Sequence, residues 1–499
     1  MVQAAQAQTT ATTLNTDNLA EISSRIPVPT YARGKAPNRI LHMSLGGFHR
    51  AHQSVYLDRL CNLEGQAGWD ICAVGLMPHD ENHVKALQAQ DGLYTILERD
   101  GTKDTAYVCG SIAELIFAIG NENAVVAQIA DATTKIVALT VTEKGYYYND
   151  KGDLDLTHAM VASDLDPANT PKTIYGYLAR GLTQRMAANL PVTIMSCDNL
   201  PGNGHLTEKL LGQFLAQYDA DLAQWVSENV TYPNAMVDRI TPVTTPEIGN
   251  LIAGEYGVTD QWPVVCESFI QWVLEDKFVA GRPALESVGV QLVSEVDPYE
   301  KMKVRLLNGS HSALSYLSYL MGYRNVDDAM HDPLVAKFVR AYMDHDITPT
   351  VPNVPGIDLD EYKDTLIARF SNRAISDKVQ RLAEDGSTKI RNAILPCIRE
   401  QMEKGGSIDY MALALAGWFR YLSGVDENGE AIEIKDPNKD ALMSRIKVEP
   451  QNAFHVLGFS EIFGDDLNKA GALIEKINTY LAMLYSKGAK ATLEEVLAS

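Results

Sequence analysis

Three polar residues recur at helical spacing in the segment "YEKMKVRLLNGSHSAL", residues 299–314. At about 100° per residue, Lys303, Asn308 and His311 fall within an arc of roughly 140°, with leucines between them. A cation, an amide and an imidazole therefore share one partly apolar side of the predicted helix. A lysine in such surroundings is a candidate general base.

The same segment carries the signals of a helix start. Asp297 and Pro298 are typical of an N-cap followed by proline at the first helical position, and Glu300 stands three residues after the cap, as in a capping box. Lys303 then lies within about two turns of the positive helix end and close to a predicted domain boundary, and both influences lower the pKa of a lysine. The alternative is that Lys303 extends into solvent and that His311 is a hydrogen-bonded core histidine.

A second candidate site is the stretch "SLGGFHR". A strand, glycines and then a helix present backbone N–H groups and a helix N-terminus to the pyrophosphate of a dinucleotide. Gly46, Gly47 and Phe48 are the candidate cofactor contacts at this turn. The fingerprint G-x-G-x-x-G is incomplete, because Ser44 occupies its first glycine place and His49 its third. An ordinary strand-to-helix turn is the alternative.

Polar residues also follow three further predicted strands, at the points where those strands end. Asp80, in "GLMPHDE", could accept hydrogen bonds from an adenosine ribose, and the alternative is an acid in a surface loop. Thr142 and Glu143, in "TVTEKGYYY", and Asn199, in "MSCDNLPGNG", come directly after apolar strands. In a parallel sheet these positions face the ligand crevice. Asn199 could bind a substrate oxygen, although asparagine is also common in turns at strand ends.

Metal and hydrolase sites are disfavoured. In "HRAH", His49 and His52 lack carboxylate or thiolate partners at metal-ligand spacing. The stretch "GSHSAL" is not a G-x-S-x-G nucleophile elbow, and Ser310 lies within the predicted helix rather than on a strand-to-helix turn.

Apolar runs rich in β-forming residues alternate with helix-length stretches up to about residue 298. The runs are "RILHMSL", "WDICAVGLM", "YTILERD", "TAYVCGSI", "KIVALTV" and "PVTIMSC". This alternation predicts an α/β domain with a mostly parallel sheet, whose functional edge lies at the carboxyl ends of the strands. The rest of the chain consists of helix-length segments. The predicted organisation is a loose N-terminal segment at 1–36, a Rossmann-like dinucleotide-binding domain at 37–290 and an all-α substrate and catalytic domain at 291–499.

The composition excludes several classes of partner. The chain has 499 residues, 46% of them hydrophobic and 21% charged, which is typical of a soluble globular protein with more than one domain. Its net charge of −21 repels phosphate backbones and anionic membranes, so neither nucleic acid nor membrane is expected as a partner. The acidic sequence is compatible with a monomer.

The cysteines and the N-terminus indicate a cytoplasmic protein. Six cysteines are scattered without a C-x-x-C pair, mostly in apolar surroundings, which predicts reduced and buried thiols in a reducing compartment. No apolar run approaches the roughly 18 residues that a membrane span needs. The N-terminal sequence lacks the basic region and the continuous hydrophobic core of a secretion signal.

Seven motifs follow one another along the chain: "GGFHRAHQ", "TEKGYY", "MSCDNLPGNG", "YPNAMVDRITP", "PVVCESFIQWVLEDKF", "KMKVRLLNGSHSAL" and "RFSNRAISDKVQRLAEDGSTK". Together they make the chain resemble the polyol-specific long-chain dehydrogenase family from about residue 38 to residue 490. The resemblance implies a metal-independent oxidoreductase that uses a nicotinamide cofactor, with a Rossmann-like N-terminal domain and a helical C-terminal domain enclosing the site.

The resemblance also implies a reaction. The favoured one is the reversible oxidation of D-mannitol to D-fructose with NAD, so that the partners are a small polyol and its ketose. D-arabinitol, D-sorbitol and fructuronate or tagaturonate stay open as alternative substrates. A non-catalytic NAD-binding protein is the alternative from another functional class.

Residue roles follow from the resemblance position by position. The family motif K-x-x-x-x-N-x-x-H matches Lys303 as the general base, Asn308 as a ligand of the carbonyl oxygen and His311 as a residue that orients the substrate. Asn199, in S-C-D-N-L, matches the second oxygen ligand.

Four further positions match residues around the family's polyol site. Asp238 matches a position that lines the site, and Arg381 and Lys389 match basic positions that reach substrate hydroxyls from the helical domain. Glu300 matches a carboxylate on the proton path between the lysine and solvent, with helix capping as the competing explanation.

The chain departs from the family pattern at two places near the cofactor. Ser44 stands where the family often has glycine, and His79 and Asp80 stand where it has an acidic pair. The remaining acid repels the 2′-phosphate of NADP, so NAD is the expected cofactor. A lone acid repels that phosphate less than a pair does, so use of NADP stays open.

Overall fold

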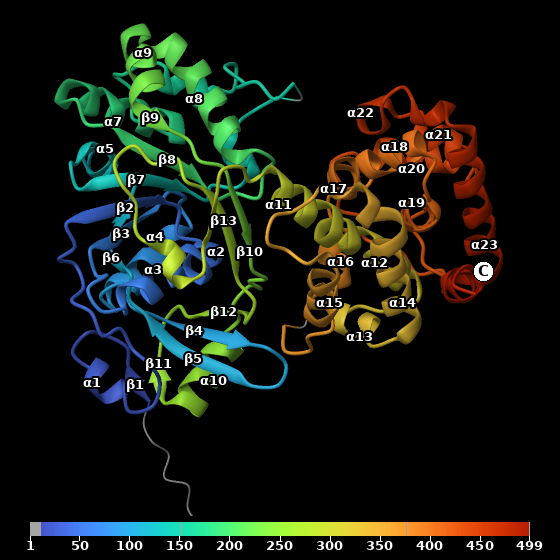
Figure 1. Ribbon diagram of the computed structural model, residues 1–499, viewed down its shortest axis with the longest axis horizontal. Helices are drawn as coiled ribbons and strands as arrows, with labels where there is room; N and C mark the ends of the chain where they lie inside the picture. The colour runs from blue at the N-terminus through green and yellow to red at the C-terminus, as the bar shows by residue number, and fades with distance from the viewer. Residues whose placement is uncertain (1–10, 150, 376, 499) are drawn as a thin grey trace, which may run out of the picture. The chain divides into compact units, whose positions relative to one another are not determined.

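The computed structural model describes residues 11–149, 151–375 and 377–498, and the chain divides into two compact units (Figure 1). Unit 1 is Met1–Val296 and unit 2 is Asp297–Ser499. The division falls a few residues after the boundary proposed from the sequence at 290/291. Each unit has its own hydrophobic interior, as expected of a domain.

Unit 1 is built on a six-stranded sheet in the order β6-β3-β2-β7-β8-β9, and every neighbouring pair is parallel. Its strands are β2 (Asn38–Met43), β3 (Trp69–Gly75), β6 (Ile112–Phe117), β7 (Thr134–Leu139), β8 (Val192–Ser196) and β9 (Val230–Thr231). The strand order reverses between β2 and β7, and ligands of such sheets bind at the carboxyl ends of the strands beside this point. The prediction of a mostly parallel α/β sheet is confirmed.

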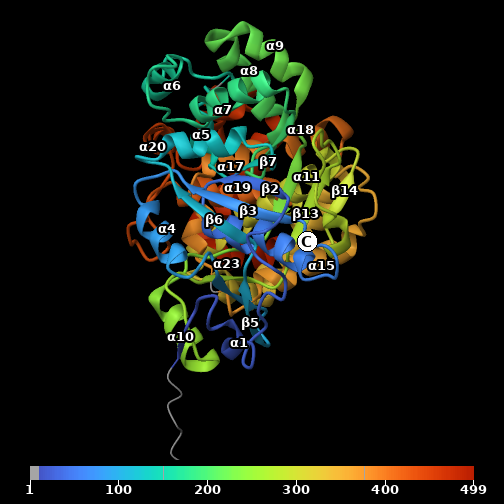
Figure 2. The same cartoon turned by 90° about the vertical axis from the view of Figure 1, so that its left-hand side faces the viewer.

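Helices cover both faces of this sheet (Figures 1 and 2). The helices of unit 1 are α1 (Leu19–Ile22), α2 (Gly47–Ala51), α3 (Gln53–Cys61), α4 (Asp80–Gln88), α5 (Glu122–Ala130), α6 (Ala159–Asp164), α7 (Ile174–Ala188), α8 (Asn203–Tyr218), α9 (Ala220–Asn229) and α10 (Pro246–Tyr256), with 3₁₀ turns at Glu143–Tyr146 and Leu285–Val288. Parallel strands are buried on both faces, so alternate residues enter different cores. Leu41 of β2 packs in the core formed with α5, α7, α8 and α9, whereas Ile40 packs in the core formed with α2, α3 and α4.

Shorter strands form three small sheets in unit 1. They are β1 (Thr12–Thr13) with β11 (Val258–Thr259), β10 (Ala235–Asp238) with β13 (Gln271–Glu275) and β14 (Gln291–Val293), and β4 (Tyr94–Arg99) with β5 (Asp104–Cys109) and β12 (Val264–Glu267). The sequence predicts β4 and β5 as strands but not their pairing as an antiparallel hairpin outside the main sheet. The connection at 100–103 is too short for the crossover that parallel strands require.

The prediction of a loose segment at 1–36 is wrong for the part that the structure describes. β1 pairs in parallel with β11, and Leu14, Ile22 and Ile26 are buried in one core with residues of β4 and β5. Residues 1–10 lie outside the described part. Three apolar side chains so far apart make no periodic pattern, so the sequence offers little sign that they are anchors.

Unit 2 is largely helical, as predicted. Its helices are α11 (Asp297–Met302), α12 (Gly309–Leu320), α13 (Val326–Met330), α14 (Pro333–Ala341), α15 (Leu359–Phe370), α16 (Val379–Ala383), α17 (Gly386–Ala393), α18 (Leu395–Lys404), α19 (Asp409–Tyr421), α20 (Lys439–Val448), α21 (Ala453–Leu457), α22 (Ser460–Phe463) and α23 (Gly471–Val496), with π turns at Lys303–Asn308 and Tyr342–Ile347 and 3₁₀ turns at Thr348–Thr350 and Leu467–Lys469. α12 is buried nearly all round and packs against α16, α17 and α19, which makes it the central helix of the unit. It follows directly on the segment that carries the candidate lysine.

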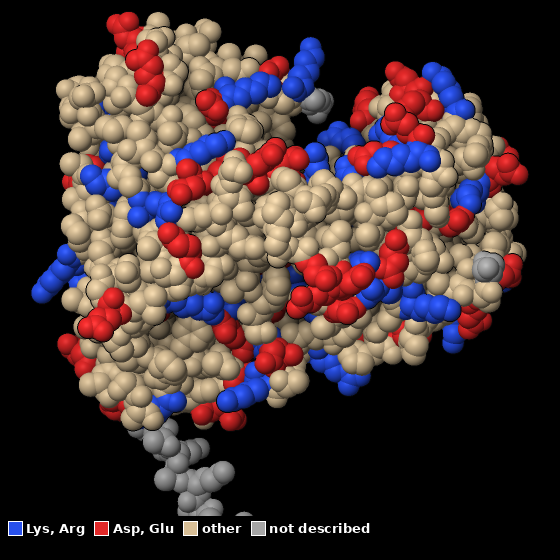
Figure 3. Space-filling view, in the orientation of Figure 1, with Lys and Arg blue, Asp and Glu red and all other residues tan. Residues whose placement is uncertain are grey.

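The surface and the thiols agree with the expectations from composition. All six cysteines are free and buried, which confirms the prediction of buried thiols. On the face shown in Figure 3, acidic side chains are interspersed with lysines and arginines. Among the described residues, every helix is too short or too polar to span a lipid bilayer.

Candidate active site

The segment Lys303–Asn308 forms a π-helical turn between α11 and α12. The prediction of one continuous α-helix over 299–314 is therefore wrong in its middle. A π turn holds about 4.4 residues, so two residues five apart differ in direction by roughly 50°, instead of the roughly 140° of an α-helix. The wide turn thus brings Lys303 and Asn308 onto nearly the same side, and such turns are frequent at functional sites.

Lys303 is buried, with 7% of its surface exposed, and Asn308 is half-buried. The neighbouring Met302, Leu306 and Leu307 are buried as well. The alternative in which Lys303 extends into solvent does not hold. Buried lysines are used as general bases in enzymes.

His311 lies in the first turn of α12, half-buried, with its ring tilted by 41° against Phe370 at 4.6 Å between centroids. Burial lowers the pKa of His311 to about 3, and the charges of Arg381 and Lys389 add to the lowering while Asp377 opposes it. The imidazole is therefore neutral near neutral pH and offers one donor and one acceptor. A neutral ring of this kind can orient a substrate hydroxyl.

Arg381 and Lys389 come from α16 and α17, which pack against α12. Arg381 Nε donates to Asp377 Oδ1 at 2.6 Å, and a second guanidinium nitrogen donates to the other oxygen of Asp377. Lys389 Nζ donates to the carbonyl oxygen of Leu382 at 3.0 Å, and burial together with the charge of Arg381 lowers the pKa of Lys389. The charges of Arg381 and Lys389 therefore act on His311 within unit 2.

In unit 1, the glycine turn lies at the carboxyl end of β2, beside the point where the strand order reverses. Gly46 is exposed and is the N-cap residue of α2, and among the described residues other than its two chain neighbours, only Ser44 Oγ, at 3.9 Å, lies within 4 Å of the place that a Cβ would take. Ser44 itself has a φ of 115°, which glycine adopts far more readily, and its N–H donates to the carbonyl of Val74 at 3.0 Å. The turn therefore keeps a glycine-like conformation and an open backbone, which fits a dinucleotide pyrophosphate.

The helix predicted after the glycines is interrupted. α2 ends at Ala51 and α3 begins at Gln53, because His52 has φ −121° and ψ −87°. His49, in the third glycine place, is buried and stacks on His42 of β2 with 3.4 Å between ring centroids. Among the described residues, no group of three or more His, Cys, Asp or Glu side chains is arranged to hold a metal ion.

Asp80 is the first residue of α4, at the end of β3 that faces the same edge. Its Oδ2 accepts a hydrogen bond from the N–H of Met77 at 2.9 Å, and its Oδ1 lies 3.6 Å from Nε2 of His79. A Cβ on Gly75 would lie 2.9 Å from the Cβ of Asp80, so the glycine allows α4 to start close to the strand. One carboxylate oxygen therefore shapes the loop where the resemblance implies a ribose contact.

Thr142, Glu143 and Asn199 are exposed and follow the adjacent strands β7 and β8. Asp198, which the sequence reasoning did not single out, joins the two loops. Its Oδ1 accepts from the N–H of Thr142 at 2.8 Å, and its Oδ2 accepts from the N–H of Val141 at 3.0 Å. The only sequence signal for this role is an acid directly before the candidate asparagine.

The remaining candidates lie at element ends. Asp238 ends β10, is buried and pairs with Gln271 of β13. Glu300 lies in the first turn of α11 and is half-buried. Unit 1 thus carries Gly46, Gly47, Phe48, Asp80, Thr142, Glu143, Asn199 and Asp238, and unit 2 carries Glu300, Lys303, Asn308, His311, Arg381 and Lys389.

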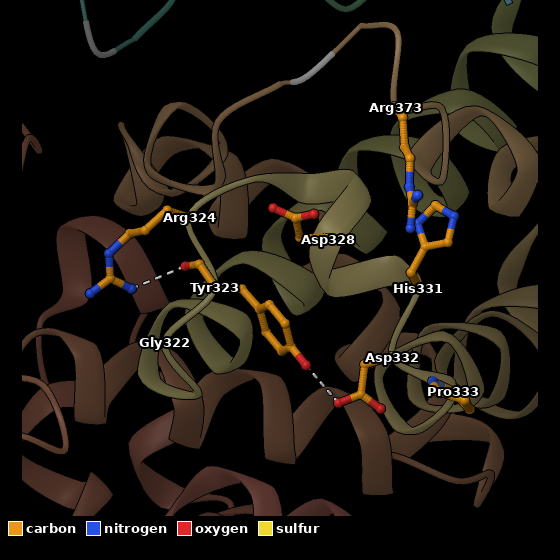
Figure 4. A pocket seen from close by; sticks show the side chains of 8 residues that line it. All are labelled: Gly322, Tyr323, Arg324, Asp328, His331, Asp332, Pro333 and Arg373. Atoms are coloured by element: carbon orange, nitrogen blue, oxygen red, sulfur yellow. Dashed lines mark hydrogen bonds between the residues drawn. The ribbon is translucent and has the colours of Figure 1, made fainter. Parts of the chain in front are cut away.

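A cavity of about 580 Å³ opens on unit 2. It is lined by Gly322, Tyr323, Arg324, Asp328, His331, Asp332, Pro333 and Arg373 (Figure 4). The Tyr323 hydroxyl donates to Asp332 at 2.8 Å. These described residues include none of the predicted site residues, so the cavity is a separate feature.

Comparison with known proteins gives concordant matches over both units. The family description "Mannitol dehydrogenase Rossmann domain" matches residues 38–287, and "Mannitol dehydrogenase C-terminal domain" matches residues 295–485. Mannitol 2-dehydrogenase of Neosartorya fischeri is 42% identical over 97% of this chain and 99% of its own length. Pseudomonas fluorescens mannitol 2-dehydrogenase, solved as a ternary complex with NAD and D-mannitol, is 42% identical with a TM-score of 0.87, over 98% of this chain and 100% of that chain. A D-sorbitol dehydrogenase solved in substrate-free form is 34% identical with a TM-score of 0.89, over 96% of this chain and 100% of that chain.

Proposed function

The chain belongs to the mannitol dehydrogenase family and is an oxidoreductase acting on CH–OH donors, and we propose that it catalyses the reversible oxidation of D-mannitol to D-fructose with NAD. The observation that carries this proposal is the buried Lys303 at the start of a π turn that ends at Asn308, with His311 shortly after it. A base, an oxygen ligand and a neutral imidazole on consecutive turns are the groups that removal of a hydroxyl proton requires.

In the proposed reaction, bound NAD would accept the hydride that leaves C2 of the polyol. Lys303, neutral in the productive complex, accepts the C2 hydroxyl proton at Nζ. Asn199 and Asn308 donate hydrogen bonds from their side-chain amides to the same oxygen as negative charge develops on it. In the direction of ketose reduction, Lys303 returns the proton to that oxygen, so one hydride and one proton are exchanged in each direction.

The other polar residues bind and orient the substrate. His311, neutral because burial lowers its pKa, holds a hydroxyl of the polyol through one donor and one acceptor. Arg381 and Lys389 bind further hydroxyls, and Asp238 lines the polyol site in unit 1. Glu300, in the first turn of α11, passes the proton between Lys303 and solvent.

The cofactor binds in unit 1 under this proposal. The open backbone at Gly46 and Gly47, followed by Phe48, receives the pyrophosphate. Asp80 accepts a hydrogen bond from the adenosine ribose, and Thr142 and Glu143 contact the cofactor from the loop after β7. With a single acid at positions 79 and 80, NAD is the preferred cofactor, and use of NADP stays open.

Mixing the protein with NADH and D-fructose and following the absorbance of NADH tests the proposal. Consumption of NADH supports an enzyme, whereas a cofactor-binding protein without catalysis would bind NADH and leave the absorbance unchanged. Dialysis against a chelator is expected to leave the rate unchanged, because Lys303 supplies the base. Loss of turnover on chelation, with recovery on adding metal, would contradict the metal-independent mechanism.

D-sorbitol is the second candidate substrate, because a D-sorbitol dehydrogenase has a closely similar structure. A panel of D-mannitol, D-sorbitol and D-arabinitol with both cofactors separates the candidates. We expect the highest kcat/KM for D-mannitol with NAD. A higher kcat/KM for D-sorbitol would reassign the substrate and leave the class of reaction unchanged.

A further inference from the structure

Asp198 stands directly before the proposed oxygen ligand Asn199, yet the mechanism above gives it no task. It is buried, with 7% of its surface exposed, at the carboxyl end of β8. We propose that Asp198 is a positioning residue that fixes Asn199 and Thr142 relative to each other. This proposal rests on the function proposed above.

The carboxylate of Asp198 accepts three hydrogen bonds from the segment after β7. Oδ1 accepts from the N–H of Thr142 at 2.8 Å, and Oδ2 accepts from the N–H of Val141 at 3.0 Å and from the hydroxyl of Tyr146 at 2.7 Å. The Tyr146 hydroxyl also lies 2.6 Å from Oγ of Ser196, the last residue of β8. One side chain therefore joins the loops that follow two adjacent strands.

Thr142 needs such support because of its backbone conformation. It has a φ of 64° and a ψ of 165°, a region that is nearly exclusive to glycine, so a β-branched residue there is strained. Thr142 is also exposed, so its own side chain is not held by a core. The bonds from its N–H and from the preceding N–H to Asp198 hold the strained residue in place.

The backbone of Asp198 extends the network to a third segment. The side-chain amide of Asn203 donates to the carbonyl of Asp198 at 3.0 Å and to the carbonyl of Ala235 at 2.7 Å, and its oxygen accepts from the N–H of Ala235 at 2.9 Å. Ala235 is the first residue of β10, which ends at Asp238. Three segments proposed to contact cofactor or substrate are thus tied to one residue.

A carboxylate suits this position better than an amide. All three groups that face it are donors, and a carboxylate only accepts, whereas an asparagine would turn its own NH₂ toward one of the two backbone N–H groups. Burial raises the pKa of Asp198, and the bonds from Tyr146, Thr142 and Val141 oppose that rise. Replacing one oxygen by NH₂ therefore leaves a buried N–H without its acceptor and displaces the loop.

The test compares Asp198→Asn with Asp164→Asn in the full-length protein. Asp164 is a matched control, because it is a fully buried acid of unit 1 that accepts from the N–H of Lys172 and from the N–H and hydroxyl of Thr173. Both substitutions replace one acceptor oxygen of a buried carboxylate that binds backbone N–H groups, so both should lower the melting temperature similarly. Only Asp198→Asn should lower kcat, by about 10- to 100-fold, because small misplacements of reacting groups cost that much.

Two further readouts separate positioning from stability. The kinetic isotope effect with C2-deuterated substrate should rise in Asp198→Asn, since a misplaced Asn199 slows the hydride step itself. The Kd for NADH, measured by fluorescence, should rise several-fold in Asp198→Asn and stay unchanged in Asp164→Asn. Equal kinetics and equal NADH affinity in the two variants would overturn the proposal.

If Asp198→Asn does not fold, Tyr146→Phe takes its place in the comparison with Asp164→Asn. This variant removes one donor and keeps both backbone bonds, so a several-fold loss of kcat relative to Asp164→Asn is expected, and wild-type kinetics would overturn the proposal. If the wild type turns over no polyol, the proposed function fails. The comparison of NADH affinities between the variants still decides whether Asp198 holds the cofactor loop.

Discussion

Lys303 is the residue on which the proposed chemistry depends most. Lys303→Ala removes the proton acceptor, so kcat should fall by about 10²- to 10⁴-fold. Binding of NADH, measured by fluorescence titration, should change little, because the glycine turn belongs to unit 1 and Lys303 to unit 2. Lys301→Ala is the control, since Lys301 is an exposed neighbour whose Nζ lies 2.8 Å from Asp297. A Lys303→Ala enzyme with near-normal turnover would refute the assignment.

The pH dependence of the two directions should have opposite signs. Oxidation needs Lys303 deprotonated and reduction needs it protonated, so the rate of oxidation should rise with pH and the rate of reduction should fall. His311 does not contribute to either profile in the usual assay range, because burial holds its pKa near 3. Rates measured in both directions over the same buffers test this.

Lys389 is the control for that experiment, since burial lowers the pKa of this second lysine. Lys389→Gln should weaken substrate binding and keep the alkaline rise in oxidation. If the alkaline rise in the rate of oxidation were lost in Lys389→Gln, the titrating group would be Lys389 and not Lys303. A flat profile in the wild type, with an isotope effect showing that chemistry limits the rate, would exclude a lysine base.

Site residues were predictable from the sequence when the local pattern around them indicated a helix face or a strand end. Lys303, Asn308 and His311 share one segment, and Asn199 stands at the end of an apolar strand. Asp198 was not predictable in the same way, because its partners at 141, 142 and 146 are far from it in the sequence. A hydrogen bond between two loops leaves no periodic signal in either of them.

Among the elements, the π turn is the one that most directly sets the site, and Gly309 is where it passes into α12. A Cβ on Gly309 would lie 2.6 Å from the hydroxyl of Tyr342, which is fully buried and cannot swing away. Gly309→Ala should therefore lower the free energy of unfolding by about 1–3 kcal/mol, despite the higher helix propensity of alanine. It should also reduce kcat, because the turn must shift.

Tyr342→Phe tests the cause of that effect. Within the described part of the chain the Tyr342 hydroxyl has no hydrogen-bond partner, so its removal alone should change stability little. The double variant Gly309→Ala/Tyr342→Phe should regain wild-type stability in urea denaturation, since the next atom of the ring lies 3.6 Å away. A double variant as unstable as Gly309→Ala would show that the clash is not the reason.

Elements followed from the sequence where one physical pattern decided them. β2, β3, β7 and β8 were predictable because strands buried on both faces read as continuous apolar runs. The π turn was not, since one residue more in a turn leaves the alternation of leucines and polar residues helical in appearance. The segment Thr12–Ile26 was missed because its fixed position comes from pairing with β11, at the far end of unit 1's sequence.

At the scale of the whole molecule, buried histidines link stability to pH. His42 and His49 stack in unit 1, and burial lowers the pKa of both, to about 3 for His49. An unfolded histidine titrates near 6.5. Below that pH the unfolded chain binds protons that the folded chain does not, so stability from these residues is complete above about pH 6.5 and is lost as the pH falls toward about 3.

Buried carboxylates act in the opposite direction. Burial raises the pKa of Asp58 and of Asp260, so the folded state binds their protons more readily than the unfolded state does. Their contribution to the free energy of unfolding therefore grows as the pH falls. The net charge of −21 also shrinks on acidification, which reduces repulsion in the folded state. The pH dependence of the wild type alone is a sum of these effects, and a variant is needed to separate them.

His49→Gln isolates the histidine contribution, because glutamine is polar and does not titrate. The unfolding free energy of the wild type minus that of the variant should fall by about 1.4 kcal/mol per pH unit below about pH 6.5, since only the wild type must exclude a proton from the fold. Urea denaturation of both proteins between about pH 7.5 and about pH 5 measures this difference. His79→Gln is the control, since the His79 side chain is 72% exposed and lies outside the stacked pair. A constant difference for His49→Gln would mean that the folded protein accepts the proton at His49, and that the stacked pair does not limit stability in acid.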